Sequence, residues 1–222
     1  MKREILITGD GSATIRLPEW NEQYHSKHGA IAEAQHVFIK SGLEYLVGNN
    51  KSELIDILEI GFGTGLNALL SLQFAALHNV PIRYTGVEAY PVAISEIEQL
   101  NYTELTQSSK EEFKQIHTVS WEEFSEIHKN FSLRKRKQFF SEITDKQEFD
   151  LIYFDAFGAR VQPELWEESI FRRMIEALRP KGVLVTYSAK GSVRRAMQAV
   201  GFTVERLPGP PGKREMLRAM KL

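Results

Sequence analysis

The chain has 222 residues, with 28 lysines and arginines against 29 aspartates and glutamates, and it contains no cysteine. This length suits one α/β domain with a continuous core, and the lack of cysteine excludes disulfide bonds, cysteine nucleophiles and thiolate metal sites. The sequence has no signal peptide pattern, no run of 18 uncharged apolar residues and no histidine spacing typical of a metal site. We therefore expect a single cytoplasmic domain over residues 1–222, with no metal and no membrane partner.

Residues 1–50 predict a β-hairpin followed by a helix. Glu4–Thr8 and Ala13–Leu17 are two short strand patterns separated by an Asp-Gly pair, which is typical of a hairpin turn. Glu33–Val47 has the apolar spacing of a helix. We expect this N-terminal extension to precede a core formed by residues 51–222.

The core alternates strand and helix patterns, which predicts a Rossmann-like α/β fold with a mostly parallel sheet. The expected strands are Ile55–Ile60, Ile82–Val87, Phe131–Phe140, Phe149–Phe154 and Val183–Tyr187. The expected helices are Leu66–Leu77, Val92–Leu100, Lys110–His128, Pro163–Leu178 and Ser192–Val200. Phe202–Leu207 and Glu215–Met220 flank a segment rich in proline and glycine, so we expect them to form a terminal antiparallel pair.

The most informative motif is the glycine turn that joins the first core strand to the next helix, Gly61-Phe62-Gly63-Thr64-Gly65. Alternate glycines let the backbone turn sharply and let a ligand approach the main chain. The dinucleotide fingerprint places its third glycine five positions after the first, whereas Gly65 follows Gly61 by four. Glu59, just before the turn, would repel a pyrophosphate and suits a cationic ligand. The alternative interpretation is a tight strand-to-helix connection without a ligand.

The cation that fits this pattern is S-adenosylmethionine, which carries an amino group and a sulfonium. The run from Glu59 to Gly65 reads E-x-G-x-G-x-G and resembles motif I of class I methyltransferases. Glu88 ends the following strand, where an acidic residue accepts hydrogen bonds from ribose hydroxyls. By itself Glu88 would be an ordinary exposed carboxylate. The three features together predict an enzyme that uses S-adenosylmethionine.

Asp155 is the candidate catalytic residue. Open α/β sheets bind ligands beyond the carboxyl ends of their strands, and Asp155 directly follows the strand Phe149–Phe154. An aspartate in this position can orient an amine and take up the positive charge that develops as the amine attacks a methyl group. The alternative role is a cap or loop anchor before the helix that Pro163 opens.

Positive charge gathers near the carboxyl terminus. Lys190–Leu222 contains eight basic residues against two acidic ones, although the net charge of the chain is −1. Together with Arg134-Lys135-Arg136-Lys137, this region can neutralise the phosphates of a nucleic acid. The alternative is an ordinary solvated surface.

Six ordered motifs between about Tyr24 and Arg218 resemble the methyltransferase of the MnmC/MnmD family. They are Gly61-Phe62-Gly63-Thr64-Gly65-Leu66-Asn67, Asp155-Ala156-Phe157, Gln162-Pro163-Glu164-Leu165-Trp166, Thr186-Tyr187-Ser188-Ala189-Lys190-Gly191-Ser192-Val193-Arg194-Arg195, Gly201-Phe202 and Gly212-Lys213-Arg214-Glu215-Met216-Leu217. Two-domain members of that family add a flavin oxidase after the methyltransferase. This chain ends at Leu222 and resembles the stand-alone form, without flavin.

The resemblance implies methyl transfer from S-adenosylmethionine to the amine of 5-aminomethyl-2-thiouridine in tRNA, giving 5-methylaminomethyl-2-thiouridine. The implied partner is the anticodon stem-loop, and a separate enzyme supplies the aminomethyl precursor. Two alternatives stay open. One is a class I methyltransferase that acts on a small-molecule or protein amine, and the other is a tRNA-binding protein that keeps the fold without catalysis.

The resemblance also implies roles for individual residues. Those implied for the cofactor are Tyr24, Glu59, Gly61, Phe62, Gly63, Thr64, Gly65, Asn67, Glu88 and Asp155, with Asp155 also beside the substrate amine. Those implied to stack on the wobble base are Phe157, Trp166 and Tyr187. Those implied to contact the tRNA backbone are Lys190, Arg194, Arg195, Lys213 and Arg214. Core packing is the alternative for Trp166, and hairpin packing is the alternative for Tyr24. The adenine contact stays unassigned, because Lys137-Gln138-Phe139 stands where related chains place an acidic residue.

Overall fold

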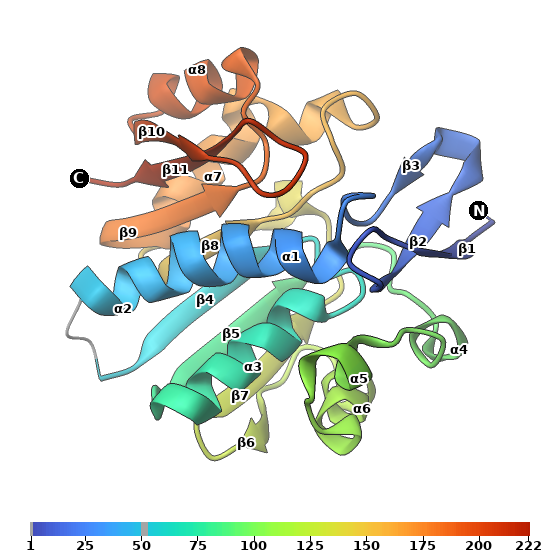
Figure 1. The fold of residues 1–222 in the computed structure, drawn as a ribbon. Coiled ribbons are helices and arrows are strands. Elements are labelled where there is room, and N and C mark those ends of the chain that lie inside the picture. Colours follow the sequence, from blue (N-terminus) through green and yellow to red (C-terminus); the bar gives the residue numbers. More distant parts are fainter. Residues whose placement is uncertain (1, 50–52) are drawn as a thin grey trace.

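The computed structural model describes residues 2–49 and 53–222. Its largest feature is an eight-stranded sheet in the order β10-β11-β9-β8-β4-β5-β7-β6, with helices on both faces (Figure 1). The strands are β4 Ile55–Ile60, β5 Ile82–Val87, β6 Ser125–His128, β7 Phe131–Arg136, β8 Phe149–Phe154, β9 Leu178–Thr186, β10 Thr203–Pro208 and β11 Glu215–Met220. The helices of this part are α3 Leu66–His78, α4 Ile94–Ile97, α5 Tyr102–Thr106, α6 Lys110–Thr118, α7 Glu168–Ala177 and α8 Gly191–Ala199.

The sheet confirms the predicted α/β class I methyltransferase fold. β4 pairs in parallel with both β5 and β8, and the parallel pairing continues outward to β7 and to β9. β10 and β11 add the expected antiparallel pair at one edge, and β6 is antiparallel at the other. The chain leaves β4 toward β5 and later returns to its other side with β8. This change of direction is the place where open α/β sheets hold their ligands.

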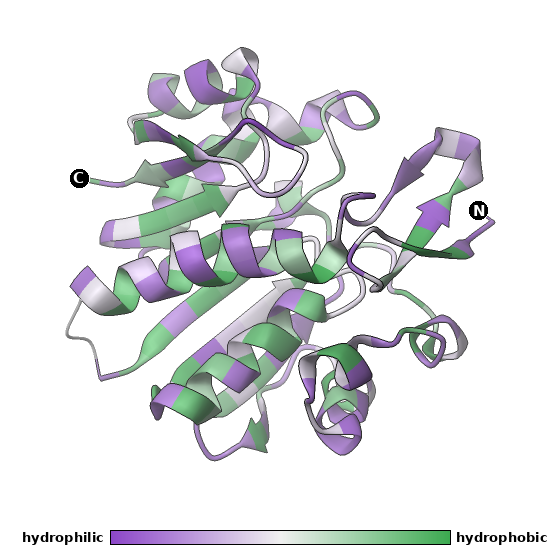
Figure 2. Cartoon of the chain, in the orientation of Figure 1, coloured by the Kyte–Doolittle hydropathy of each residue, from purple (hydrophilic) through white to green (hydrophobic). Residues whose placement is uncertain are grey.

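The core is divided between the two faces of the sheet. Successive residues of β4 point to opposite faces, so Ile57 joins one apolar cluster while Leu58 joins the other. The first cluster packs under α3 and the N-terminal helix, and the second packs under α7 and α8. Apolar residues therefore follow the central strands and the inner faces of the helices (Figure 2). Both faces of the central strands are covered, so polar groups meet solvent or ligand mainly at the strand ends.

The N-terminal extension forms a small second sheet and one long helical segment. The predicted hairpin is present as β1 Glu4–Ile7 and β2 Ala13–Leu17, and a third strand that we did not predict, β3 Glu22–Gln23, pairs with β2. The helical segment runs through α1 Ala30–Ala34, the π-helical stretch η2 Gln35–Glu44 and α2 Tyr45–Asn49. The expected boundary between extension and core, at residues 50 and 51, lies outside the described residues.

Several expected elements are shorter than their sequence patterns. The predicted helix Lys110–His128 is wrong beyond Thr118, because Glu122 has a positive φ of 72° and its N–H donates to the Lys135 carbonyl at 2.7 Å. The chain then turns into β6 beside β7. The predicted helix Pro163–Leu178 is a 3-10 turn, η4 Pro163–Trp166, followed by α7, since extended backbone at Glu167 separates the two.

The structure corrects the interpretation of the basic run at residues 134–137. Lys135 is buried and donates to the His117 carbonyl at 2.6 Å. Arg136 forms two hydrogen bonds with Asp145, at 2.6 and 2.7 Å. Arg134 lies over the ring of Phe124, 4.6 Å from its centroid. This run lies in and directly after strand β7 and does not offer a continuous basic surface to phosphates.

The Arg136–Asp145 pair generates a stability prediction. Both side chains are mostly buried, at 12% and 8% exposure. Burial is the largest single effect on the pKa of Asp145 and would raise it, but the hydrogen bonds and the positive charge of Arg136, with smaller contributions from a backbone hydrogen bond and Arg134, together lower that pKa. Asp145→Ala leaves the guanidinium buried without its partner, so we expect the free energy of unfolding to fall by about 3 kcal/mol at pH 7 in urea titrations. The loss should shrink as the pH falls through the lowered pKa, since protonation then weakens the pair in the wild type as well.

The double variant Asp145→Ala/Arg136→Met is the control. If the two residues act as a pair, the double variant loses less stability than the sum of the single losses. Strictly additive losses would mean that the pair does not stabilise the fold.

Candidate active site

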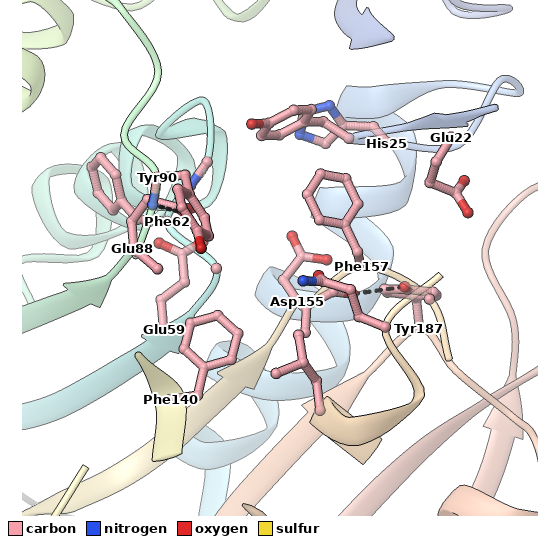
Figure 3. A pocket seen from close by; sticks show the side chains of 18 of the residues that line it. Glu22, His25, Glu59, Phe62, Glu88, Tyr90, Phe140, Asp155, Phe157 and Tyr187 are labelled. Carbon is pink, nitrogen blue, oxygen red and sulfur yellow. Dashed lines mark hydrogen bonds between the residues drawn. The ribbon is translucent and has the colours of Figure 1, made fainter. Parts of the chain in front are cut away.

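A cavity of about 1160 Å³ lies beyond the carboxyl ends of β4, β5 and β8. Its floor is the glycine turn after β4, and its walls come from the segments that follow β5 and β8. The N-terminal extension contributes a further wall, and Lys213 reaches in from the loop between β10 and β11. Figure 3 shows the Glu59, Glu88 and Asp155 carboxyl groups around the space, with Phe157 and Tyr187 nearby. The sheet thus brings together most of the residues that the sequence singled out.

The glycine turn presents bare main chain to this cavity. Gly61 has a φ of 88°, and a side-chain carbon on it would lie 2.7 Å from the carbonyl oxygen of Asp155. The turn is pinned to β5, because the N–H groups of Gly61 and Phe62 both donate to the Val87 carbonyl at 3.0 Å. Only glycine combines this backbone conformation with so close an approach of β8. A ligand can therefore lie directly against the backbone.

Asn67, in the first turn of α3, joins two carboxyl groups at the bottom of the cavity. Its amide nitrogen donates to Glu59 Oε1 at 2.8 Å and to Asp155 Oδ2 at 2.9 Å. Within the described part of the chain, the buried atoms Glu59 Oε2 and Asn67 Oδ1 have no hydrogen-bond partner. Buried acceptors without partners are costly, so the site is suited to a ligand that brings N–H donors. The amino group of S-adenosylmethionine meets this requirement.

Burial changes the protonation of the two carboxyl groups. It raises the pKa of Glu59 well above its usual value, and the nearby Asp155 raises it further. Burial also raises the pKa of Asp155 to about 7, and the carboxylate of Glu33 adds to the increase. Glu59 is thus harder to ionise than an ordinary glutamate, while Asp155 lies near the midpoint of its titration at neutral pH. A carboxyl group poised in this way can accept or release a proton at physiological pH.

Glu88 stands at the end of β5 and organises the rim of the cavity. Its two oxygens accept hydrogen bonds from the backbone N–H groups of Gly63, at 3.1 Å, and Tyr90, at 2.9 Å. It remains partly exposed to the cavity. A carboxylate oxygen accepts more than one hydrogen bond, so Glu88 keeps acceptor capacity for a ligand. Its position matches the one predicted from the sequence.

Aromatic side chains form one wall of the cavity. Phe157 packs edge to face against Tyr24 and Trp20, with ring centroids 5.0 and 5.8 Å apart. Arg160 fastens this wall, donating to the Asn21 carbonyl at 3.0 Å and to Glu22 at 3.1 Å. The sequence analysis missed Trp20, because it stands in an irregular segment where no periodic pattern marks it.

Trp166 and Tyr187 differ in their relation to the cavity. Trp166 is 5% exposed and lies outside the cavity lining; its indole N–H donates to the Phe157 carbonyl at 2.7 Å. The structure therefore supports the alternative role of Trp166 in the core, where it holds Phe157 in place. Tyr187 does line the cavity, and its hydroxyl donates to the Ala156 carbonyl at 2.8 Å.

The five residues predicted to contact tRNA fall into two groups in the structure. Lys190, Arg194 and Arg195 stand at the beginning of α8, where Lys190 and Arg195 are exposed, and Arg214 is exposed on the loop between β10 and β11. Lys213 is different, because it turns into the cavity and pairs with Glu33 at 2.5 Å. Sequence reasoning missed Glu33 as a site residue, since a glutamate in a helix pattern carries no signal of its own.

No cluster of three or more potential metal ligands occurs among the residues that the structure describes. Across the same residues, no helix is long and apolar enough to cross a membrane.

Comparisons with known proteins agree with this geometry. Residues 95–222 match the S-adenosyl-L-methionine-dependent methyltransferase family. The chain is 28% identical to the tRNA 5-methylaminomethyl-2-thiouridine biosynthesis bifunctional protein MnmC of Cupriavidus metallidurans, over 96% of this chain and 33% of that protein. The protein of the same name from Leptospira interrogans is also 28% identical, over 96% of this chain and 34% of its own length. The chain thus spans about a third of these relatives.

Solved structures support the fold assignment. MnmC2 from Aquifex aeolicus superposes with a TM-score of 0.75 at 24% identity, covering 98% of this chain and 69% of that one. Spermidine synthase from Thermotoga maritima superposes with a TM-score of 0.59 at 14% identity, covering 99% of this chain and 68% of that one. The chain belongs to the S-adenosyl-L-methionine-dependent methyltransferase family, and within it the chain is similar to the MnmC proteins.

Proposed function

We propose that this chain methylates the amine of 5-aminomethyl-2-thiouridine at the wobble position of tRNA, giving 5-methylaminomethyl-2-thiouridine. The observation that carries the proposal is the similarity to MnmC over 96% of the chain, since those relatives are named for the biosynthesis of this product. The chain matches only a third of each relative, so the proposal is limited to the methyl transfer.

The residues of the cavity floor fit the methyl donor. We assign the backbone of the turn from Gly61 to Gly65 to the methionine part of S-adenosylmethionine. The unpaired oxygens Glu59 Oε2 and Asn67 Oδ1 are assigned to the same part. Glu88 is assigned to the ribose hydroxyls, and Tyr24 covers the turn, since its ring lies 3.1 Å from a side-chain carbon built on Gly63. When bound, S-adenosylmethionine supplies the methyl carbon, which the amine lone pair attacks as the carbon–sulfur bond breaks with its electron pair on sulfur.

Asp155 is the proposed catalytic residue. A free alkyl amine has a pKa near ~10 and is mostly protonated at neutral pH, so its lone pair must be released before attack. Asp155, with a pKa of about 7, orients the amine by a hydrogen bond and stabilises the positive charge that develops on nitrogen. The product ammonium then loses one proton, which Asp155 can accept and pass to solvent.

The remaining walls suit a flipped-out RNA base. Unpaired bases are commonly held by stacking on aromatic faces, and Phe157 presents such a face beside Trp20. The basic residues at the start of α8, together with Arg214, are assigned to the phosphates of the anticodon stem-loop. We also propose that residues 1–50 are an extension of one catalytic domain, since they supply Tyr24 and Glu33 to the cavity.

The decisive measurement is methyl transfer from radiolabelled S-adenosylmethionine to tRNA that carries 5-aminomethyl-2-thiouridine. We expect label in the wobble nucleoside after nuclease digestion and chromatography, and none in the same tRNA without the aminomethyl group. Label in neither tRNA, despite measurable cofactor binding, would contradict the proposal. Such a result would favour a small-molecule or protein amine as the acceptor.

Asp155→Asn should separate catalysis from stability. The variant keeps the shape of the side chain but loses its charge, so we expect turnover to fall by at least ~10²-fold with cofactor binding retained. In the wild type the raised pKa means that stability falls as the pH rises toward and through about 7, because the folded protein must then bury a charge. Without cofactor, the variant should gain on the order of 2 kcal/mol over the wild type between pH 5 and pH 8 in urea titrations.

Glu126→Gln, on the exposed edge strand β6, serves as the control and should change neither quantity. Undiminished turnover in Asp155→Asn would remove Asp155 from the mechanism, and a pH-independent stability difference would contradict its raised pKa.

Charge reversal at the start of α8 tests the RNA surface. Arg194→Glu/Arg195→Glu should weaken tRNA binding by roughly tenfold or more at low salt, because two phosphate contacts become repulsive, and should flatten the salt dependence of binding. Filter binding at several salt concentrations measures both effects.

The matched control is Lys114→Glu/Lys129→Glu, which makes the same change in net charge at two exposed lysines on other elements. Equal weakening by both pairs would indicate a response to net charge alone and would rule out a specific role for α8.

A further inference from the structure

The cavity contains an ion pair beside Asp155 that the proposed mechanism has not used. Lys213 Nζ lies 2.5 Å from Glu33 Oε2 and 3.9 Å from the centroid of the Tyr187 ring. All three residues line the same cavity as Asp155. They come from α1, from the segment after β9 and from the loop between β10 and β11. Three separate parts of the chain therefore place one cation and one anion beside the catalytic carboxyl group.

The pair is held in a fixed position. Glu33 is buried at 7% exposure, and its other oxygen accepts a hydrogen bond from the Ser26 N–H at 3.0 Å. The Tyr187 hydroxyl donates a hydrogen bond to the carbonyl of Ala156, the residue after Asp155. The Tyr187 ring, which the Lys213 ammonium contacts, is therefore tied to the backbone beside Asp155. The backbone N–H of Lys213 donates to the Pro210 carbonyl at 2.9 Å. A salt bridge with one buried partner and a cation–π contact is much less screened than a surface pair.

Both charges act on Asp155. Burial is the largest cause of its raised pKa; the Glu33 carboxylate raises that pKa further, while the Lys213 ammonium lowers it. The same two charges must act on an amine bound at Asp155. A carboxylate close to an amine favours the ammonium form, and a nearby cation favours the neutral form. Without Lys213, the amine would face two carboxylates and would remain protonated.

We infer that the Glu33–Lys213 pair sets the charge balance beside Asp155: Lys213 offsets part of the Glu33 charge, so that a bound acceptor amine loses its proton at a lower pH than it would beside an unopposed Glu33. Glu33 and Lys213 are thus positioning residues for charge rather than groups that react. The inference rests on the proposed function, because it concerns the pH at which the acceptor amine loses its proton. It also gives Lys213 a role inside the cavity in place of the predicted contact with the tRNA backbone.

Other titratable groups also face the cavity. The carboxyl groups are Glu22, Glu33, Glu59, Glu88, Glu164 and Glu167 in addition to Asp155. The remaining groups are Arg3, Tyr24, His25, Tyr90, Tyr187 and Lys213. Burial lowers the pKa of His25 to about 4 and raises the pKa of Tyr24 to about 12, so neither changes its protonation between pH 6 and pH 9. In that interval, Asp155 and the bound amine are the groups whose protonation the pair is expected to govern.

The test is the pH dependence of the single-turnover methylation rate at saturating S-adenosylmethionine and saturating aminomethyl-tRNA. In Lys213→Met, Glu33 is left without its cation. The rising limb of the pH–rate profile should therefore move to higher pH by about one unit, which corresponds to a roughly tenfold lower rate at pH 7.5. In Glu33→Gln, Lys213 is left without its anion, so the rising limb should move to lower pH by a similar amount. The double variant should return close to the wild type, and Lys213→Arg should keep the wild-type limb.

Lys40→Met removes an exposed lysine of η2 and is the control, with no expected movement of the limb. Shifts of the rising limb in opposite directions in the two single variants distinguish an electrostatic effect from a loss of folded structure. A loss of structure would lower the rate in both variants without shifting the limb in opposite directions. Limbs that stay in place, or that move in the same direction, would overturn the inference.

A second measurement does not depend on activity. In ¹³C-labelled protein, the Asp155 carboxyl resonance, assigned by its loss in Asp155→Asn, should titrate at higher pH in Lys213→Met and at lower pH in Glu33→Gln. An unchanged titration in both variants overturns the inference even if the enzyme methylates tRNA. A wild-type enzyme that does not methylate aminomethyl-tRNA instead contradicts the proposed function, while the titration still decides whether the pair controls the charge at Asp155.

Discussion

The chemistry of this protein depends on one amide group. Asn67 donates from a single nitrogen to Glu59 and to Asp155, and so holds two carboxyl groups side by side where the sheet changes direction. Burial disfavours the ionised form of both groups, raising the pKa of Glu59 well above its usual value and the pKa of Asp155 to about 7. The glycine turn is equally constrained by this arrangement, because only a residue without a side chain fits between β4 and the Asp155 carbonyl. Cofactor site and catalytic carboxyl group are therefore parts of one arrangement.

Much of the fold and part of the site could be predicted from the sequence. Buried parallel strands such as β4 and β8 have continuous apolar runs, and their ends must meet at one edge of the sheet. The positions of Glu59, Glu88 and Asp155 follow from that rule alone. The turn was recognisable because its glycines are required by backbone geometry, which leaves a local signal in the sequence.

The rest of the site depends on contacts that leave no local signal. Trp20 lies in an irregular segment, and contacts from distant residues hold it at the cavity: Arg160 binds the Asn21 carbonyl beside it, and Phe157 packs against its ring. Lys213 was grouped with its basic neighbours, yet it points inward because Glu33, 180 residues earlier, accepts its charge. The run at residues 134–137 shows the opposite error, since strand alternation buries Lys135, whose charge looks exposed in the sequence. Charge patterns predict surfaces only when the partners of each charge are known.

The separation of Glu33 and Lys213 along the chain has a consequence for synthesis on the ribosome. The glycine turn, Asn67 and Asp155 all precede β9 in the sequence, so the residues of the cavity floor are synthesised while the last strands are still missing. Lys213 arrives with the final antiparallel pair, which closes the edge of the sheet. If Lys213 lowers the pKa of the acceptor amine, a nascent chain therefore contains the residues assigned to the methyl donor before it contains the cation that acts on the acceptor.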